Sequence, residues 1–381
     1  MTFHLKPLAP IALLLAAASA QAAPTISVTT FATGGAVSAT QPDSITSGDG
    51  SVWVEYGNGA DSTGAMGNST IVQYSMSGAV EHTYTVTGLV DGLKFSPVTG
   101  MVWALQNNDG NSTLSLIDPT AHTVSAPLMY ASPPYVYGAS SGRGYDDVAF
   151  LNGKVYLSNT NPANPTDSVL QILDQGNSPS GTLTTTSILT AQQTNPAFTS
   201  SSQGPPDTDS LKTTPSGQLV LTSEGDSTTA ASTDGRYTLI SNPGTATQTF
   251  SNLRITNSAM VTVNKMDDVI FPGATAGTLY VTDTSNNTVY AIHLTGLDPN
   301  TPIVTLGSFD EVALVNPMTG VVGTPLLSGH KGLHGLEFVA ATSSAPEPST
   351  WPMLLLGLGG LALAARGRRK CGTPARLAPA T

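Results

Sequence analysis

Six short phrases in the chain share one pattern: an acid, or in one case a histidine, followed by a small or polar residue and then an apolar one. Carboxylates and imidazoles bind cations and transfer protons, so these phrases hold the residues with which chemistry could begin. Successive first residues are 48, 55, 63, 58 and 67 residues apart. The phrases are Asp43-Ser44-Ile45, Asp91-Gly92-Leu93, Asp146-Asp147-Val148, Asp209-Ser210-Leu211, Asp267-Asp268-Val269 and His334-Gly335-Leu336.

Two roles are open for the first residue of each phrase. Five carboxylates gathered around a narrow opening would repel one another unless a cation or backbone donors compensated them. Alternatively, each aspartate accepts hydrogen bonds from nearby backbone N–H groups and fixes the turn before a strand, which requires no ligand. His334 stands where the other phrases have an acid, so a binding or acid/base role is open for it as well.

The elements of a small antiparallel sheet follow each phrase. A glycine-containing turn leads to a short alternating strand, then to a polar loop, a third strand and usually a fourth. Four antiparallel strands per unit make one blade of a β-propeller. Second strands are predicted at residues 51–54, 101–104, 154–157, 218–221 and 278–281, and third strands at residues 69–74, 113–117, 168–173, 236–240 and 288–292.

The sequence therefore predicts an all-β fold, a β-propeller of six four-stranded blades. An isolated four-stranded sheet would expose two apolar faces, and radial packing of blades buries both. Residues 25–31 offer a spare strand that could complete the blade of the sixth phrase and close the ring. Five or seven blades are the alternatives, because residues 309–327 are hard to place.

The composition narrows the setting and the partners of this domain. The 38 Gly and 27 Pro suit a turn-rich β-fold, and the 39% hydrophobic content is ample for a packed core. Residues 23–348 hold eight basic and 25 acidic side chains, a formal net charge of −17, which disfavours binding to nucleic acid. The only cysteine, Cys371, lies near the C-terminus, so the domain before it has no disulfide and no thiol nucleophile.

The two ends of the chain carry sorting signals. Lys6, an apolar run at residues 10–18 and small residues up to Ala22 predict a secretory signal peptide over residues 1–22. At the other end, Pro346-Glu347-Pro348 precedes an apolar run at residues 353–365 and a basic cluster at residues 366–370. The apolar run is short for a permanent span, and the basic cluster would hold its end at the cytoplasmic face.

This order of tripeptide, apolar helix and basic cluster resembles the PEP-CTERM sorting signal of Gram-negative bacteria. The resemblance implies a membrane protease of the exosortase type as a transient partner, and it names Pro346, Glu347 and Pro348 as the sorting motif. We therefore expect a signal peptide at residues 1–22, a propeller at 23–344, a sorting signal with a hydrophobic helix at 345–370, and a short polar tail at 371–381. The helix would hold the precursor transiently in the inner membrane.

Residues 266–290 resemble the repeats of NHL and related six-bladed propellers. Lactonase and gluconolactonase-like members of that group hold a catalytic calcium at the channel, so the resemblance implies calcium as the possible cofactor of the acidic ring. The leading hypothesis is a non-enzymatic protein, surface-anchored or secreted, that binds extracellular polysaccharide or surface proteins in a biofilm matrix. The alternatives are a calcium-dependent lactonase-like hydrolase that uses the ring, and a structural matrix protein without a specific ligand.

Overall fold

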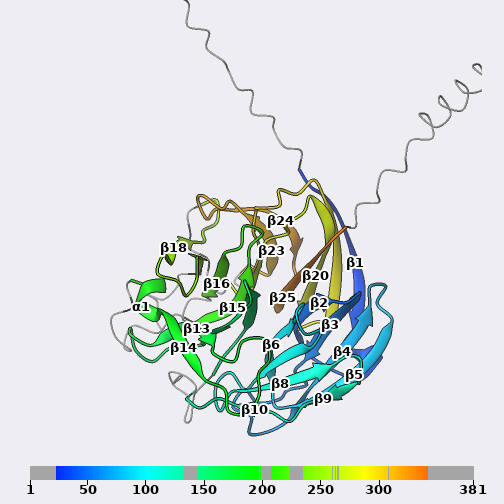
Figure 1. The fold of residues 1–381 in the computed structure, drawn as a ribbon. Coiled ribbons are helices and arrows are strands. Elements are labelled where there is room, and N and C mark those ends of the chain that lie inside the picture. Colours follow the sequence, from blue (N-terminus) through cyan, green and yellow to red (C-terminus); the bar gives the residue numbers. More distant parts are fainter. Residues whose placement is uncertain are drawn as a thin grey trace, which may run out of the picture. The chain divides into compact units, whose positions relative to one another are not determined.

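The computed structural model describes residues 23–132, 144–196, 198, 207–223, 235–259, 261, 263, 266–307 and 309–341 (Figure 1). Over these residues the chain is a six-bladed β-propeller with almost no helix. The all-β class and the six blades predicted from the sequence are confirmed. The expected signal peptide and the hydrophobic sorting helix lie outside the described residues.

The first three blades follow the chain in order, each with its innermost strand first. Blade 1 is β2 (Pro42–Gly48), β3 (Ser51–Tyr56), β4 (Asn68–Ser75) and β5 (Val80–Thr87). Blade 2 is β6 (Val90–Phe95), β7 (Val102–Gln106) and β8 (Thr113–Asp118), with the short strands β9 (Thr123–Val124) and β10 (Leu128–Met129) both paired to β8. Blade 3 is β11 (Val148–Leu151), β12 (Lys154–Ser158), β13 (Ser168–Leu173) and β14 (Thr185–Thr190).

The last three blades complete the ring, and the two short helices lie between strands. Blade 4 is β15 (Thr208–Thr213), β16 (Leu219–Ser223), β17 (Arg236–Ser241) and β18 (Thr249–Arg254). Blade 5 is β19 (Val269–Ile270), β22 (Ile303–Leu306), β23 (Glu311–Val315) and β24 (Val322–Ser328), and blade 6 is β25 (Leu333–Ala340), β20 (Ala276–Asp283), β21 (Thr288–Thr295) and β1 (Thr25–Thr33). The helices are η1 (Gly34–Val37) and α1 (Ala191–Thr194).

Blade 6 closes the ring by pairing the two ends of the described chain. β1 forms its outer edge through an antiparallel ladder with β21, and β25 forms its innermost strand against β20. This arrangement matches the expected use of residues 25–31 as a spare strand. Closure of this kind leaves only short edges exposed to other chains.

The strands of blades 5 and 6 are interleaved along the chain, which the repeat pattern did not predict. The phrase at Asp267 leads into β19, which pairs with β22 rather than with the following strand β20. β20 belongs to blade 6, where it pairs with β25 from Gly277 to Asp283. Residues 309–327, which were hard to place, fall on β23 and β24 of blade 5. A local pattern predicts strands but not their partners, because either neighbouring sheet can satisfy an antiparallel edge.

Aromatic side chains on the second strands pack between the blades. Each of these side chains pairs with the residue three positions after the first residue of a phrase, so their register positions match. They are Trp53, Trp103, Tyr156 and Tyr280. All four are buried. Burying one such side chain stabilises the fold by roughly 2–3 kcal/mol. These contacts fix the angle between blades and therefore the positions of the innermost strands that surround the channel.

Candidate functional site

The six first residues of the phrases all line one cavity, at the end of the channel where the innermost strands begin. Its volume is about 240 Å³, and its wall is largely polar. Each of the six blades contributes one member of the set. We call Asp43, Asp91, Asp146, Asp209, Asp267 and His334 the mouth ring.

β-bulges present several of these side chains to the channel. The pairing of β2 with β3 shifts between Pro42 and Ile45, and that of β6 with β7 shifts between Val90 and Gly92. The same irregularity occurs between Thr208 and Leu211 in β15. A bulge places two residues opposite one and re-aims the side chains. The acid and the residue after it can therefore both face the channel, although a regular strand would alternate them.

Hydrogen bonds from the neighbouring blade hold the backbone of the mouth ring. A hydroxyl on the second strand of one blade donates to the carbonyl oxygen of the ring residue in the next. The bonds run from Ser158 to Asp209 (2.9 Å), from Thr222 to Asp267 (3.2 Å) and from Thr282 to Asp43 (2.6 Å). In blade 1 the donor to the Asp91 carbonyl is instead the hydroxyl of Ser44, on the innermost strand β2. The ring is thus built from blade-to-blade contacts and its side chains project from a fixed backbone.

The mouth ring divides into two groups of three. Ligand atoms of Asp43, Asp267 and His334 all lie within 4.8 Å of one another. His334 Nδ1 is 3.3 Å from Asp43 Oδ1 and 2.9 Å from Asp267 Oδ1. We call this group the histidine triad. It joins blades 5, 6 and 1 across the point where the ring closes.

The second group contains only carboxylates. Asp91, Asp146 and Asp209 also bring one oxygen each within 4.8 Å of the others, and we call them the carboxylate triad. The Asn108 amide bridges two of them, since its Nδ2 lies 3.0 Å from Asp91 Oδ2 and 3.3 Å from Asp146 Oδ1. Its Oδ1 is buried and makes no hydrogen bond to the described residues. Asn108 follows β7, and its role was not predicted from the sequence.

Burial and mutual repulsion raise the pKa values of three acids of the ring, Asp43, Asp91 and Asp146. Burial raises the pKa of Asp43 to about 7, with Asp91 and Asp267 adding to the rise and His334 opposing it. The pKa of Asp91 is also raised by burial. That of Asp146 is raised well above its usual value, first by burial and then by the charge of Asp91. A cation at the mouth would reverse these effects by favouring the charged carboxylates.

Glu55 is a buried acid behind the mouth ring that sequence reasoning missed. It lies on β3 with no exposed surface. Its pKa is raised well above the usual value, first by burial and then by the charge of Asp43, while the Ser69 hydroxyl and the Ser44 N–H favour its charged form. The register position of Glu55 holds a hydroxyl residue in four other blades, namely Ser158, Thr222, Thr282 and Thr305.

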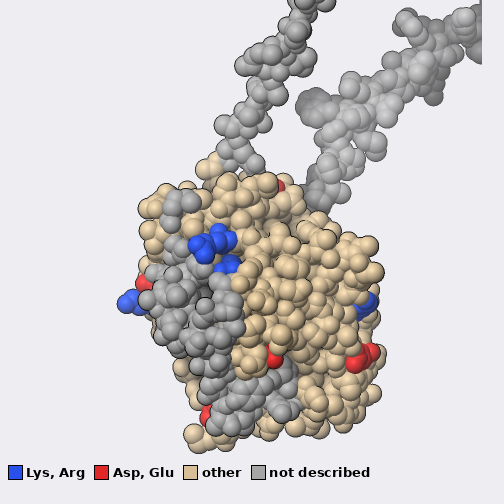
Figure 2. Space-filling view, turned by 90° about the vertical axis from the view of Figure 1, so that its left-hand side faces the viewer, with Lys and Arg blue, Asp and Glu red and all other residues tan. Residues whose placement is uncertain are grey.

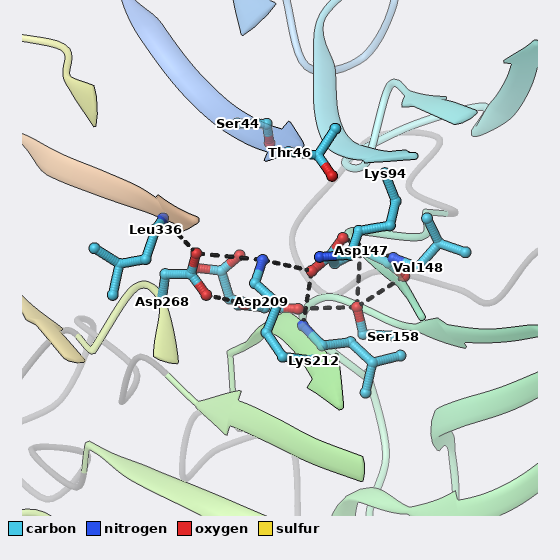
Figure 3. A network of polar contacts seen from close by, with 12 residues as sticks. Ser44, Thr46, Lys94, Asp147, Val148, Ser158, Asp209, Lys212, Asp268 and Leu336 are labelled. Atoms are coloured by element: carbon cyan, nitrogen blue, oxygen red, sulfur yellow. Dashed lines mark hydrogen bonds and ion pairs between the residues drawn. The ribbon is translucent and has the colours of Figure 1, made fainter. Parts of the chain in front are cut away.

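Below the mouth ring, Lys212 forms a buried ion network (Figure 3). Its Nζ lies 3.3 Å from Asp147 Oδ2 and 3.2 Å from Asp268 Oδ2. Opposite charges raise the pKa of Lys212 above its usual value although its burial opposes this. Each aspartate is the second acid of a doublet whose first acid stands in the mouth ring. We call these three residues the lysine network.

The backbone-fixing role considered for the mouth ring is found at these second acids. Asp147 accepts the N–H groups of Val148 at 2.7 Å and Leu211 at 2.9 Å. Asp268 accepts those of Val269 and Leu336, both at 2.7 Å. Because Leu211 and Leu336 belong to other blades, these carboxylates join neighbouring innermost strands as well as fixing turns. Figure 3 shows them converging on Lys212.

Other residues with possible chemistry lie apart from the mouth ring. His330 Nδ1 is 3.3 Å from the buried Asp283 Oδ2, and Asp283 also accepts the backbone N–H of Asn286. The rings of His82 and His122 stack with centroids 4.3 Å apart. The tripeptide Pro346-Glu347-Pro348 lies outside the described residues. Among the residues that the structure describes, no helix is long and apolar enough to cross a membrane.

The fold and the sequence of its C-terminal part define a class, an exported six-bladed propeller with a sorting tail. Residues 344–370 match the PEP-CTERM protein-sorting motif, which contains Pro346, Glu347 and Pro348. The chain thus carries a PEP-CTERM sorting motif, as predicted. The motif implies export, membrane-associated sorting and processing by an exosortase.

Comparison with solved structures finds propellers of low similarity. A protein from Lactobacillus plantarum is 10% identical, with 78% of this chain and 88% of the other covered and a TM-score of 0.45. The periplasmic gluconolactonase of Pseudomonas aeruginosa is 13% identical, with 79% and 89% covered and a TM-score of 0.40. Hydrazine synthase of Kuenenia stuttgartiensis is 11% identical, with 73% and 77% covered and a TM-score of 0.39. Similarity at this level carries no argument about function, and a search of curated proteins found no match to this chain.

Proposed function

We propose that this protein is an exported binding protein of the cell surface or extracellular matrix, and that it binds its ligand at the mouth ring. The observation that carries the proposal is that all six blades place their first phrase residue in one cavity of about 240 Å³. The side chains of Asp43 and Asp267 contact His334, and those of Asp91 and Asp146 contact Asn108. Backbone-fixing bonds are made by the second acids Asp147 and Asp268. Six convergent polar groups on a rigid scaffold are typical of a ligand site.

Charge indicates the chemistry of the ligand. Residues 23–348 carry a formal net charge of −17, and the mouth concentrates carboxylates, so polyanions are repelled. On the face in Figure 2, charged side chains are few and scattered. Carboxylates accept hydrogen bonds from hydroxyl groups and pair with ammonium groups. A neutral or amine-bearing extracellular polysaccharide is therefore the proposed ligand, encountered after exosortase processing, either on the outer surface or in the surrounding matrix.

Binding of defined polysaccharides to the processed chain, residues 23–348, tests this proposal. All six blades close within residues 25–340, so this fragment contains the complete fold. Asp91→Asn combined with Asp146→Asn should weaken binding at least tenfold in calorimetry. Asp49→Asn is the matched control, because Asp49 is exposed in the hairpin at the other end of β2. Equal affinity of the ring double variant and the control variant would place the ligand elsewhere.

A calcium-dependent hydrolase of lactones is the second candidate function, and the carboxylate triad is the observation in its favour. Ca²⁺ prefers oxygen ligands, and Asp91, Asp146 and Asp209 supply three. The unpartnered Oδ1 of Asn108 would give a fourth after rotation of the amide, so the donor set fits this ion. When bound, calcium would polarise a lactone carbonyl. The residues of the chain itself would hold the substrate at the mouth, with His334 placed to carry a proton.

Hydrolysis assays separate the two functions. The enzyme candidate requires lactone hydrolysis that is lost with a calcium chelator and with Asp146→Ala or Asp267→Ala. The binding candidate requires polysaccharide affinity without turnover. A protein that shows neither property but remains folded would fit a structural matrix role.

A further inference from the structure

The histidine triad has the geometry of a transition-metal site. Its three ligand atoms come from three blades, and the His334 Nδ1 atom is 2.9 and 3.3 Å from the two carboxylate oxygens. Metal–ligand bonds of about 2.0–2.2 Å in a tetrahedral zinc centre place neighbouring ligand atoms roughly 3.3 Å apart. The side chains of the triad are already close to this spacing. A metal could therefore be accommodated with small side-chain rotations.

The donor set distinguishes this triad from its neighbour in the mouth. Imidazole nitrogen is a ligand for zinc and other first-row transition metals, whereas calcium and magnesium select oxygen. The carboxylate triad offers only oxygen atoms, and the histidine triad offers two oxygens and one nitrogen. The side chains of His334 and Asp43 are 33% and 29% exposed, so the triad also faces the cavity. Three protein ligands with one open side are the pattern of zinc sites that keep an exchangeable position.

Glu55 supplies an independent reason to expect a cation here. Its carboxyl is fully buried, and the charge that acts on it most strongly is that of Asp43. A buried carboxyl costs free energy when it is charged unless a cation lies close to it. The charge of Asp43 opposes the ionisation of Glu55, and a divalent ion bound to Asp43 would remove this repulsion.

We propose that Asp43, Asp267 and His334 bind a divalent first-row transition metal, with Zn²⁺ preferred, and leave one coordination position open to the cavity. This site is separate from the calcium ligands considered above and does not depend on the identity of the polysaccharide. It would give the mouth two cation sites of different chemistry. The contrasting arrangement, in which a protonated His334 simply pairs with two aspartates, predicts no metal binding at all.

Titration with Co²⁺ tests the proposal, because its visible absorption reports the ligands directly. The processed chain, treated with chelator and then exchanged into buffer, should bind one Co²⁺ and develop bands of a four- or five-coordinate site. One equivalent of Zn²⁺ should abolish the bands, and a hundredfold excess of Ca²⁺ should leave them in place. His334→Gln should weaken Co²⁺ binding at least a hundredfold. Absence of the bands in the wild type would overturn the proposal.

Matched variants separate ligation from folding. Asp209→Asn removes a member of the other triad, and His330→Gln removes the nearby histidine that pairs with Asp283. Both should retain the Co²⁺ bands. Asp267→Asn provides a second loss-of-ligand variant if His334→Gln does not fold, as judged by circular dichroism. Bands that survive in Asp267→Asn and in a folded His334→Gln would refute the assignment, whatever the result of the polysaccharide titration.

Discussion

Replacing Lys212 with methionine should destabilise the propeller more than any single change at its surface. Methionine keeps the length and most of the volume of the lysine stem but removes its charge. Asp147 and Asp268 would then face each other across a buried space without a cation. Their backbone hydrogen bonds to Leu211 and Leu336 would still hold both carboxylates in place.

The size of the effect follows from the burial of the network. The side chains of Lys212, Asp147 and Asp268 are only 9%, 9% and 4% exposed, so solvent cannot replace the lost charge. Removing one partner from such an ion pair costs about 3–5 kcal/mol. A domain of this kind has a total stability of roughly 5–15 kcal/mol. The variant should therefore lose a large share of its stability and still fold at room temperature.

The loss should depend on pH in a defined direction. Burial already raises the pKa of Asp268, and Lys212 opposes the rise. Without the lysine this pKa increases further, so the variant carries an uncompensated charge only at pH values above it. Its deficit should be largest near pH 8 and shrink as the pH falls toward 5, where Asp268 takes up a proton.

Urea denaturation of the wild type, Lys212→Met and the control Lys331→Met measures these differences. Lys331 is exposed, so its replacement should change the free energy of unfolding by less than about 0.5 kcal/mol. Adding Asp268→Asn to Lys212→Met removes one of the two unpaired charges and should restore 1–2 kcal/mol, an amount on the order of half a broken pair. A Lys212→Met variant as stable as the control at pH 8 would refute the view that this lysine is needed to neutralise the network.

The remaining predictions concern the mouth ring and the contacts between neighbouring blades. Burial raises the pKa of Asp43 to about 7, so the stability that comes from protonated Asp43 is complete near pH 4 and is lost as the pH rises through 7. The chelator-treated wild type should therefore have a lower urea midpoint at pH 8 than at pH 5. A higher midpoint at pH 8 would contradict this. Glu55→Gln keeps the shape of the side chain without the charge and should raise stability by about 1 kcal/mol at pH 8 and leave it unchanged at pH 5, as measured by thermal melting. Gly92→Ala should cost about 1–3 kcal/mol because an added Cβ meets the carbonyl oxygen of Asp146 in the next blade, whereas Gly35→Ala, which meets nothing within 4 Å, should be close to neutral in the same melts.

The mouth ring could be located from the sequence because each blade of the propeller repeats the same local structure. An acid, or in the sixth phrase a histidine, recurs at or just before the start of each innermost strand, and the repeat itself indicates that all copies share one environment. The interleaved order of the strands in blades 5 and 6 could not be predicted in this way. β19 has only two residues, and it pairs with β22, more than 30 residues further along the chain, rather than with the nearer β20. Such pairing energies belong to contacts distant in sequence, which no local pattern contains.

Lys212 and Glu55 escaped prediction for a different reason. Glu55 lies at a repeat position whose counterparts in four other blades are serine or threonine, so an alignment of the blades by strand register would have marked it as an exception. The position of Lys212 varies between blades and holds another lysine, Lys94, in blade 2 and Glu337 in blade 6, so the same alignment would not have marked Lys212. That register depends on the β-bulges, which shift the numbering by one and are visible only in the sheet.

The two acids of each doublet have different partners and different roles at the channel. Asp147 and Asp268 point to Lys212 and to backbone N–H groups of other blades, so their charges are compensated and contribute to the closed ring. Asp146 and Asp267 stand one residue earlier in the mouth, where burial raises the pKa of Asp146 well above its usual value. Natural folds tolerate such strained charge at functional sites when the surrounding structure is otherwise consistent. The lysine network compensates the second acids, and the electrostatic cost that remains at the mouth is the physical reason to expect a cationic or hydrogen-bonding ligand there.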